Sequence, residues 1–129
     1  MEKEFVPYEF ALKLKTLGFD KPCFGWYQSG RLKKEYHPLK ENSGNQSYML
    51  EDDCTAPTFS QAFRWFREKY KLHTEIRSYT AKYFTIIIQE CKDIVRYIEY
   101  GGIYLKFKTY EEAEISCLNK LIEIVEINK

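Results

Sequence analysis

The strongest constraint on the fold is the stretch Ala56–Leu72, because it combines a helix start with a periodic run of aromatic residues. Thr58 followed three residues later by Gln61 is the pattern of a capping box, in which each side chain bonds the backbone of the other residue. Apolar residues then recur at spacings of three and four, which puts them on one side of a helix: Phe59, Ala62, Phe63, Phe66 and Tyr70. The sequence therefore predicts a helix over residues 58–71 with this apolar stripe in the core.

The opposite side of the predicted helix is basic, and we refer to it as the basic face. Its candidate contact residues are Arg64, Trp65, Arg67 and Lys71, with Arg77 on the following predicted strand. Trp65 is expected at the boundary between the apolar stripe and the basic face. An aromatic ring beside guanidinium groups is suited to contact a nucleotide, a single-stranded nucleic acid or a protein partner. The alternative is a solvated helix face on which Arg64 pairs with Glu68, four residues later.

A first helix is predicted near the start of the chain, over residues 7–18. Pro7 opens it at a position where the missing N–H costs nothing. Gly18 ends it as a left-handed cap, and Phe19 is expected to fold back toward Leu14.

A β-hairpin is predicted over residues 22–36, with Ser29 and Gly30 at its turn. Gly25 inside the first strand indicates a bulge or a close backbone approach, or is simply tolerated. Residues 37–55 are polar and aperiodic, which predicts a long loop. A mobile surface loop is favoured over a binding loop, and residues 48–50 could form a short strand within it.

Strands are predicted over residues 73–108. The run Ile86–Ile88 indicates a strand that is covered on both faces. Residues 91–100 match helical spacing, whereas residues 94–100 and 103–107 match the two strands of a hairpin with its turn at Gly101-Gly102. The hairpin is favoured, because the flanks of the turn are rich in Ile, Val and Tyr.

A last helix is predicted over residues 109–127. Thr109 and Glu112 form a second capping box, and small and large apolar residues follow at helical spacing. A helix this apolar is expected to pack on a sheet or on a partner chain, so a homodimer is one expectation.

Together these elements predict an α+β fold in a single domain over residues 1–129, with an antiparallel β-sheet of hairpins or a meander packed against two or three helices. A chain of 129 residues with 44% hydrophobic residues is long and apolar enough to bury one core. The net charge of +1 removes the compositional argument for a nucleic-acid-binding protein.

The compartment is predicted from the N-terminus and the cysteines. Met1 is followed by charged residues rather than by the apolar core of a secretory signal, and no apolar run approaches the roughly 20 residues that span a bilayer. The four cysteines are scattered without a CxxC pair, which favours free thiols over disulfides. We therefore expect a cytoplasmic protein that does not bind a membrane.

No residue pattern indicates a cofactor, a metal site or a catalytic residue. Residues 51–53 are acidic but lack the spacing of a calcium-binding loop, so a solvated acidic loop is favoured over a cation site. His37 and His73 have no ligand spacing with the cysteines. A non-enzymatic role is favoured over an enzyme.

The order of elements from Thr58 onward, a helix, three or four strands and a helix, resembles double-stranded RNA-binding domains. The small residues Ala113 and Cys117 of the last helix are similar to theirs in spacing. That family places lysines at the start of its last helix, where this chain has Tyr110 and the acidic residues Glu111, Glu112 and Glu114. Carboxylates repel the phosphate backbone, so the resemblance implies the fold and argues against RNA binding.

Three further stretches, FVPYEFALKLKTLGFDKPCFGWY, APTFSQAFRWFREKY and TYEEAEISCLNKLIEIVE, resemble a family of small uncharacterised proteins encoded by phages and prophages. The resemblance covers nearly the whole chain except Arg31–Asp53. It implies expression in a bacterial cytoplasm and no particular activity or site residue.

Two functions follow as hypotheses. The first is a non-enzymatic, phage-type accessory protein that binds a protein partner, either another protein or a second copy of itself. The second is a protein that binds a nucleotide or another small ligand, for example a signalling nucleotide that it sequesters, through the basic face. Nucleic-acid binding is the less favoured alternative.

Overall fold

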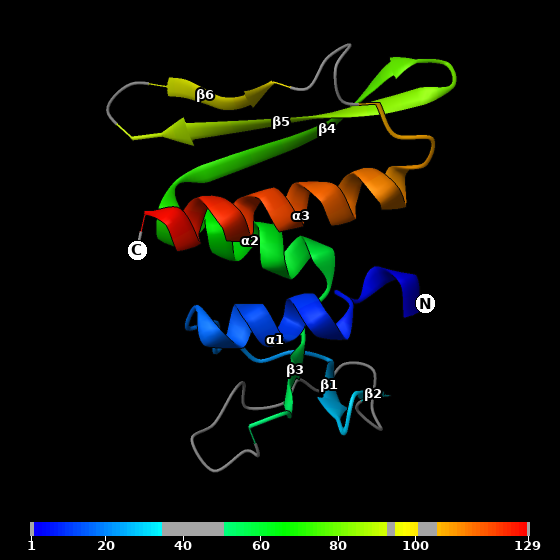
Figure 1. Ribbon diagram of the computed structural model, residues 1–129, viewed down its shortest axis with the longest axis vertical. Helices are drawn as coiled ribbons and strands as arrows, with labels where there is room; N and C mark the ends of the chain where they lie inside the picture. Colours follow the sequence, from blue (N-terminus) through cyan, green and yellow to red (C-terminus); the bar gives the residue numbers. More distant parts are fainter. Residues whose placement is uncertain (1, 35–50, 93–94, 101–105, 129) are drawn as a thin grey trace. The chain divides into compact units, whose positions relative to one another are not determined.

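The computed structural model describes residues 2–34, 51–92, 95–100 and 106–128 of the chain. Over these residues the fold is α+β, as predicted, with three α-helices and two antiparallel three-stranded sheets (Figure 1). The chain divides into two compact units, Met1–Ala62 and Phe63–Lys129, and each unit contains one of the sheets. The single-domain organisation stays a prediction.

The first unit contains a short 3-10 helix, one α-helix and three strands. They are η1 (Glu2–Glu4), α1 (Tyr8–Thr16), β1 (Gly25–Gln28), β2 (Arg31–Lys34) and β3 (Cys54–Ala56). The strands pair antiparallel in the order β2-β1-β3, and α1 contacts β3.

The predicted hairpin is formed by β1 and β2. Its turn residues Ser29 and Gly30 have φ values of 54° and 78°, so both adopt the left-handed conformation that a two-residue hairpin turn requires. Gly25 opens β1, and a Cβ at this position would lie 2.9 Å from the carbonyl oxygen of Lys33. Of the three explanations for this glycine, the structure shows the close backbone approach.

The end of α1 matches the predicted cap. Gly18 has a φ of 100°, its N–H donates to the carbonyl oxygen of Lys15, and the N–H of Phe19 donates to that of Leu14 at 2.9 Å. Leu14 and Phe19 are both buried. This pair of hydrogen bonds satisfies carbonyl groups that the helix end would otherwise leave unbonded.

The loop prediction for residues 37–55 is wrong at its end, because Cys54 and Thr55 belong to β3 and pair with Tyr27 and Trp26 of β1. All three residues of β3 are buried. Residues 37–50, including the short strand considered at 48–50, lie outside the described residues.

The central helix, α2 (Phe59–Tyr70), starts with the predicted capping box. The N–H of Gln61 donates to Thr58 Oγ1 at 3.2 Å, and the N–H of Thr58 donates to Gln61 Oε1 at 2.9 Å. The helix ends where Lys71 takes a positive φ of 60°. Phe59, Ala62 and Phe66 of the apolar stripe are buried, whereas Phe63 and Tyr70 are half-buried.

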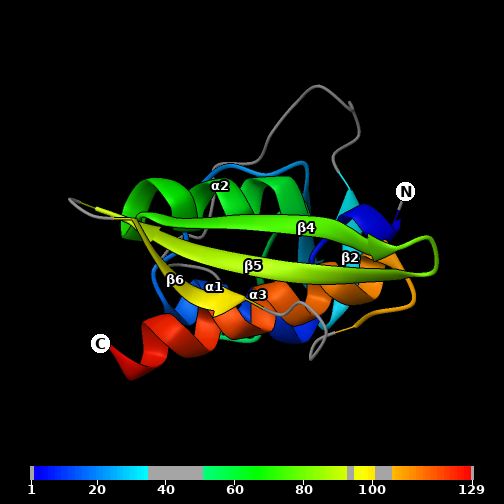
Figure 2. The ribbon, with the colours of Figure 1, turned by 90° about the horizontal axis from the view of Figure 1, so that it is seen from above.

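The second unit contains a three-stranded meander. Its strands are β4 (Leu72–Thr80), β5 (Tyr83–Cys91) and β6 (Val95–Tyr100), in the order β4-β5-β6. Figure 2 shows β5 between its two neighbours. Ile86–Ile88 of β5 are buried, as expected for a strand covered on both faces.

In the ambiguous stretch, Cys91 ends β5 and Val95–Tyr100 form β6, so the alternative of a helix is wrong for these residues. β6 pairs antiparallel with β5, from Val95 opposite Cys91 to Tyr100 opposite Ile87. The turn predicted at Gly101-Gly102 lies outside the described residues. Further along the chain, the backbone of Phe107 exchanges two hydrogen bonds of 2.8 Å with Phe84 of β5.

The last helix, α3 (Tyr110–Ile127), packs against β4 and β5 and supplies much of the core of the second unit. Thr109 caps it, because its Oγ1 accepts from the N–H of Glu112 at 3.1 Å. The buried residues of α3 are Ala113, Cys117, Leu118, Leu121, Ile122 and Val125. Within the described ranges, no helix combines the length and the apolar character needed to cross a membrane.

Candidate binding surfaces

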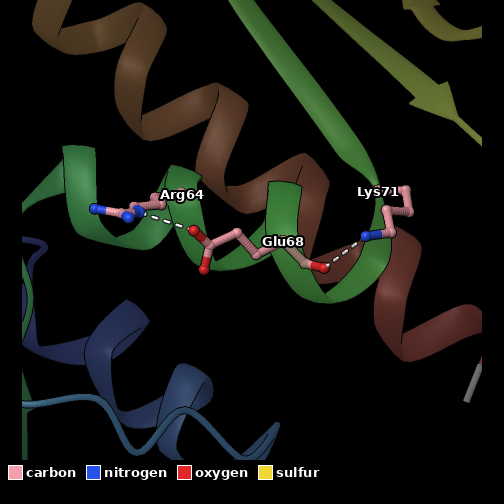
Figure 3. A network of polar contacts seen from close by, with 3 residues as sticks. All are labelled: Arg64, Glu68 and Lys71. Carbon is pink, nitrogen blue, oxygen red and sulfur yellow. Dashed lines mark hydrogen bonds and ion pairs between the residues drawn. The ribbon is translucent and has the colours of Figure 1, made fainter.

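The basic face of α2 is interrupted by an acidic residue. Arg64 Nε donates to Glu68 Oε1 at 2.8 Å, and Lys71 Nζ donates to the carbonyl oxygen of Glu68 at 3.2 Å (Figure 3). The hydrogen bond and the charge of Glu68 raise the pKa of Arg64, and both side chains remain well exposed. The helix geometry thus produces the solvated i,i+4 pair that the sequence left as an alternative.

Trp65 lies in the protein rather than at the boundary of the basic face, because only 5% of its surface is exposed. Its ring makes edge contacts with Phe66 and Tyr70 at centroid distances of 5.1 and 5.5 Å. Lys69 Nζ lies 5.1 Å from the centroid of the Trp65 ring. The structure therefore places Trp65 with the buried residues of α2 and not at the boundary expected from the sequence.

The two remaining predicted contact residues, Arg67 and Arg77, lie on different elements. Arg67 is exposed on α2. Arg77 lies on β4, where its Nε and Nη2 donate to the two carboxylate oxygens of Glu75 at 2.8 and 3.1 Å. Arg67 shares the exposed face of α2 with Arg64, three residues earlier, and Arg64 and Lys71 both contact Glu68.

A pocket that the sequence did not predict lies in the second unit, and we call it the C-terminal pocket. Its volume is about 820 Å³, and its walls come from the end of α2, the start of β4, the end of β5, the middle of β6 and the last turn of α3. The lining residues are Tyr70, Leu72, Glu90, Lys92, Tyr97, Ile98, Ile124, Val125, Ile127 and Asn128. Its charged members pair with each other, since Lys92 Nζ lies 3.7 Å from Glu90 Oε2.

Two apolar walls of the C-terminal pocket are open to solvent. The exposed fraction is 58% for Tyr97 and 81% for Ile127, whereas the Leu72 side of the pocket is buried. The signal in the sequence was the continuation of apolar residues to the end of α3, with Ile127 three residues after Ile124. The contribution of Tyr97 could not be found, because it depends on whether residues 91–100 form a helix or a strand.

A second pocket, of about 560 Å³, lies in the first unit beside the acidic residues 51–53. Tyr8 Oη donates to the carbonyl oxygen of Asp52 at 2.7 Å, and Lys15 Nζ donates to that of Asp53 at 2.6 Å. The N–H of Ser29 donates to Asp53 Oδ1 at 3.2 Å. These contacts hold the acidic turn against α1 and the hairpin, and they place a cation, Lys15, beside the oxygens that a metal ion would use.

Two of the buried thiols are poor nucleophiles. None of the four cysteines forms a disulfide, and Cys23, Cys54 and Cys117 are buried. Burial raises the pKa of Cys54 to about 11 and that of Cys117 to about 12, so both stay protonated at neutral pH. Among the residues that the structure describes, no group of three or more His, Cys, Asp and Glu side chains is placed to hold a metal ion.

Comparison with models of known protein families, with curated proteins and with solved structures finds no match for this chain.

Proposed function

We propose that this protein is a small non-enzymatic accessory protein that binds another protein through the C-terminal pocket. The observation that carries the proposal is an apolar pocket whose rim residues, Tyr97 and Ile127, are exposed. Exposed apolar side chains around a concavity favour a partner that covers them with an apolar side chain of its own.

The energetics of such a pocket suit protein binding. Complete burial of one large apolar side chain contributes roughly 1.5–3 kcal/mol, and a few such residues supply most of the binding free energy of a protein interface. Tyr97 adds a hydroxyl that can bond a partner backbone at the edge of the pocket. The Glu90–Lys92 pair is neutral overall, so the pocket selects by shape and apolar character more than by charge.

The alternative, a protein that binds a nucleotide or another small ligand, has less support. It requires an exposed ring beside Arg64, and Trp65 is buried. It also requires guanidinium groups that are available for phosphate, whereas Arg64 and Arg77 each bond a carboxylate. Among the described residues, nucleic-acid binding has no more support than nucleotide binding.

The cellular setting is part of the proposal. The resemblance to phage and prophage proteins supports a role in the cytoplasm of a bacterial host, during infection or lysogeny. In that setting the partner is a host or phage protein.

Site-specific photocrosslinking tests the proposal. A photoreactive phenylalanine analogue replaces Tyr97, and the chain is expressed in a bacterium that carries the phage or prophage. Illumination is expected to give a discrete adduct with one protein, and the additional change Ile127→Glu is expected to abolish it. The matched control carries the analogue in place of Tyr110, which is exposed at the other end of α3.

Two results would count against the proposal. One is the absence of any adduct at position 97, and the other is the same set of adducts from both positions, which would indicate random collision. Calorimetric titration with nucleotides tests the alternative, since binding that disappears in the double variant Arg64→Glu/Arg67→Glu would support a nucleotide site instead.

A further inference from the structure

The first strand of the second sheet, β4, is an edge strand. β5 pairs along one side of it, and over the described part of the chain no strand pairs along the other side (Figure 2). β4 is nine residues long, and its residues Glu75, Arg77, Ser78, Tyr79 and Thr80 are exposed. An edge of this length presents a row of backbone N–H and C=O groups, and natural proteins usually protect such edges with lysine, proline, a β-bulge or a short strand. β4 contains neither lysine nor proline, and its pairing with β5 is regular from Leu72 to Ser78 and shifts only between Ser78 and Thr80.

The order of residues in β4 is complementary to itself in the antiparallel direction. If Ile76 of one copy faces Ile76 of another, Glu75 faces Arg77 and Arg77 faces Glu75. Thr74 then faces Ser78 on each side. Every charge on the strand thus meets an opposite charge, and cross-strand pairs of this kind stabilise a sheet by roughly 0.2–1 kcal/mol each.

The charges also select this register over its neighbours. A shift of two residues in one direction places Glu75 opposite Glu75, and a shift in the other direction places Arg77 opposite Arg77. Like charges directly opposite each other destabilise a strand pair. Only the register centred on Ile76 pairs opposite charges on both sides of a twofold axis.

The monomer already holds these two side chains in position. Arg77 forms two hydrogen bonds with Glu75 on the same strand, and about half of each side chain is exposed. In the paired arrangement the four groups alternate in charge around the axis, and each carboxylate lies between two guanidinium groups. The same contacts are repeated by symmetry, which is the property of an isologous dimer interface.

We propose that the protein forms a homodimer in which the β4 strands of two copies pair antiparallel, centred on Ile76, and join the two sheets into one. The partner surface is a second copy of this chain. The proposal is independent of the C-terminal pocket and of its partner.

The oligomeric state of the full chain and a charge exchange between its copies test the proposal. Light scattering on the wild type is expected to give twice the monomer mass of 15.5 kDa. The variants Arg77→Glu and Glu75→Arg each place like charges opposite each other, and each is expected to raise the dissociation constant by about tenfold or more. Mixing these two variants in equal amounts is expected to restore a dimer, because the copy with two acidic residues then faces the copy with two basic ones.

The controls separate the interface from the fold. The double variant Glu75→Arg/Arg77→Glu exchanges both charges and is expected to dimerise like the wild type. Arg64→Glu breaks an ion pair on α2 that is more exposed than the Arg77–Glu75 pair, and it is expected to leave the dimer intact. Circular dichroism checks that each variant folds. A monomeric wild type at all concentrations, a dimer that Arg77→Glu does not weaken, or a mixture that forms no heterodimer would each overturn the proposal.

Discussion

The hydroxyl of Tyr27 donates a 2.6 Å hydrogen bond to the backbone carbonyl oxygen of Val6. This bond joins β1 to the segment that precedes α1, and both residues are buried. The ring of Tyr27 also makes an edge contact with Tyr8, at a centroid distance of 5.4 Å. One hydroxyl therefore connects the N-terminal segment to the first sheet.

The change Tyr27→Phe is expected to lower the free energy of unfolding by about 1–2 kcal/mol, because it keeps the ring but leaves a buried carbonyl oxygen without this donor. Urea denaturation measures the change. Tyr8→Phe is the matched control, since its hydroxyl also bonds a carbonyl oxygen but in an exposed position, and it is expected to cost less than about 0.5 kcal/mol. Equal losses of unfolding free energy in the two variants would contradict the role given to the burial of the Tyr27 hydrogen bond.

The change Thr58→Ala removes the hydroxyl that accepts from the N–H of Gln61 at the start of α2. Loss of an N-cap of this kind costs about 1 kcal/mol of stability. Thr58→Ser keeps the hydroxyl and is expected to stay within about 0.5 kcal/mol of the wild type. The midpoints of thermal unfolding of the three proteins measure these changes. A serine variant as unstable as the alanine variant would show that loss of the cap does not cause the loss of stability.

The change Gly25→Ala is expected to destabilise the first sheet by about 1–3 kcal/mol, because the new Cβ would lie 2.9 Å from the Lys33 carbonyl oxygen and 3.2 Å from the Phe5 ring. The Lys33 carbonyl belongs to β2 and cannot move without disturbing the hairpin. Gly30→Asn is the control, since asparagine tolerates a positive φ and the nearest atom to a Cβ there is 3.9 Å away. Unchanged stability of Gly25→Ala in urea would mean that the hairpin can shift.

Stability is expected to fall at alkaline pH through Cys117, whose pKa is raised to about 12 by burial. In the unfolded chain a thiol loses its proton near about pH 8.5, whereas the native protein keeps it. The contribution of the protonated Cys117 thiol to the free energy of unfolding is therefore fully present below about pH 8.5. It decreases as the pH rises, by up to about 1.4 kcal/mol per pH unit. Between about pH 8 and pH 10, the wild type should lose about 2 kcal/mol more than Cys117→Ala in urea titrations. If the free energies of unfolding of the two proteins change with pH in parallel, Cys117 is not the cause of the alkaline loss.

The helix starts could be predicted because their signals are local. Thr58 with Gln61 and Thr109 with Glu112 each occupy four residues, and the structure places both helix starts within one residue of the prediction. The hairpin turn at Ser29 and Gly30 was found for the same reason. In these places the residues that determine the conformation are also the residues that adopt it.

The errors arose where the outcome depends on distant residues. β3 has three residues, and it is a strand because it pairs with β1, which lies far from it in the sequence. On α2, Phe63 forms one edge of the apolar stripe and Trp65 lies beside the other edge, so spacing alone does not decide which of the two is covered. The structure buries Trp65 more than Phe63, so the basic face has no exposed tryptophan ring. The C-terminal pocket could not be predicted, because its walls come from three strands and two helices.

The two sheets differ in how far along the chain their partners lie, and this bears on the order of folding. In the second unit, β4 pairs with β5 and β5 with β6, so each pairing closes a short loop. In the first unit, Tyr27 pairs with Cys54, and the chain must close a much longer loop before β3 contributes any contact. Local pairings form faster than distant ones, because the entropy of loop closure is lost before the contacts are gained. We therefore expect the meander and the β1–β2 hairpin to form before β3 docks and completes the first sheet.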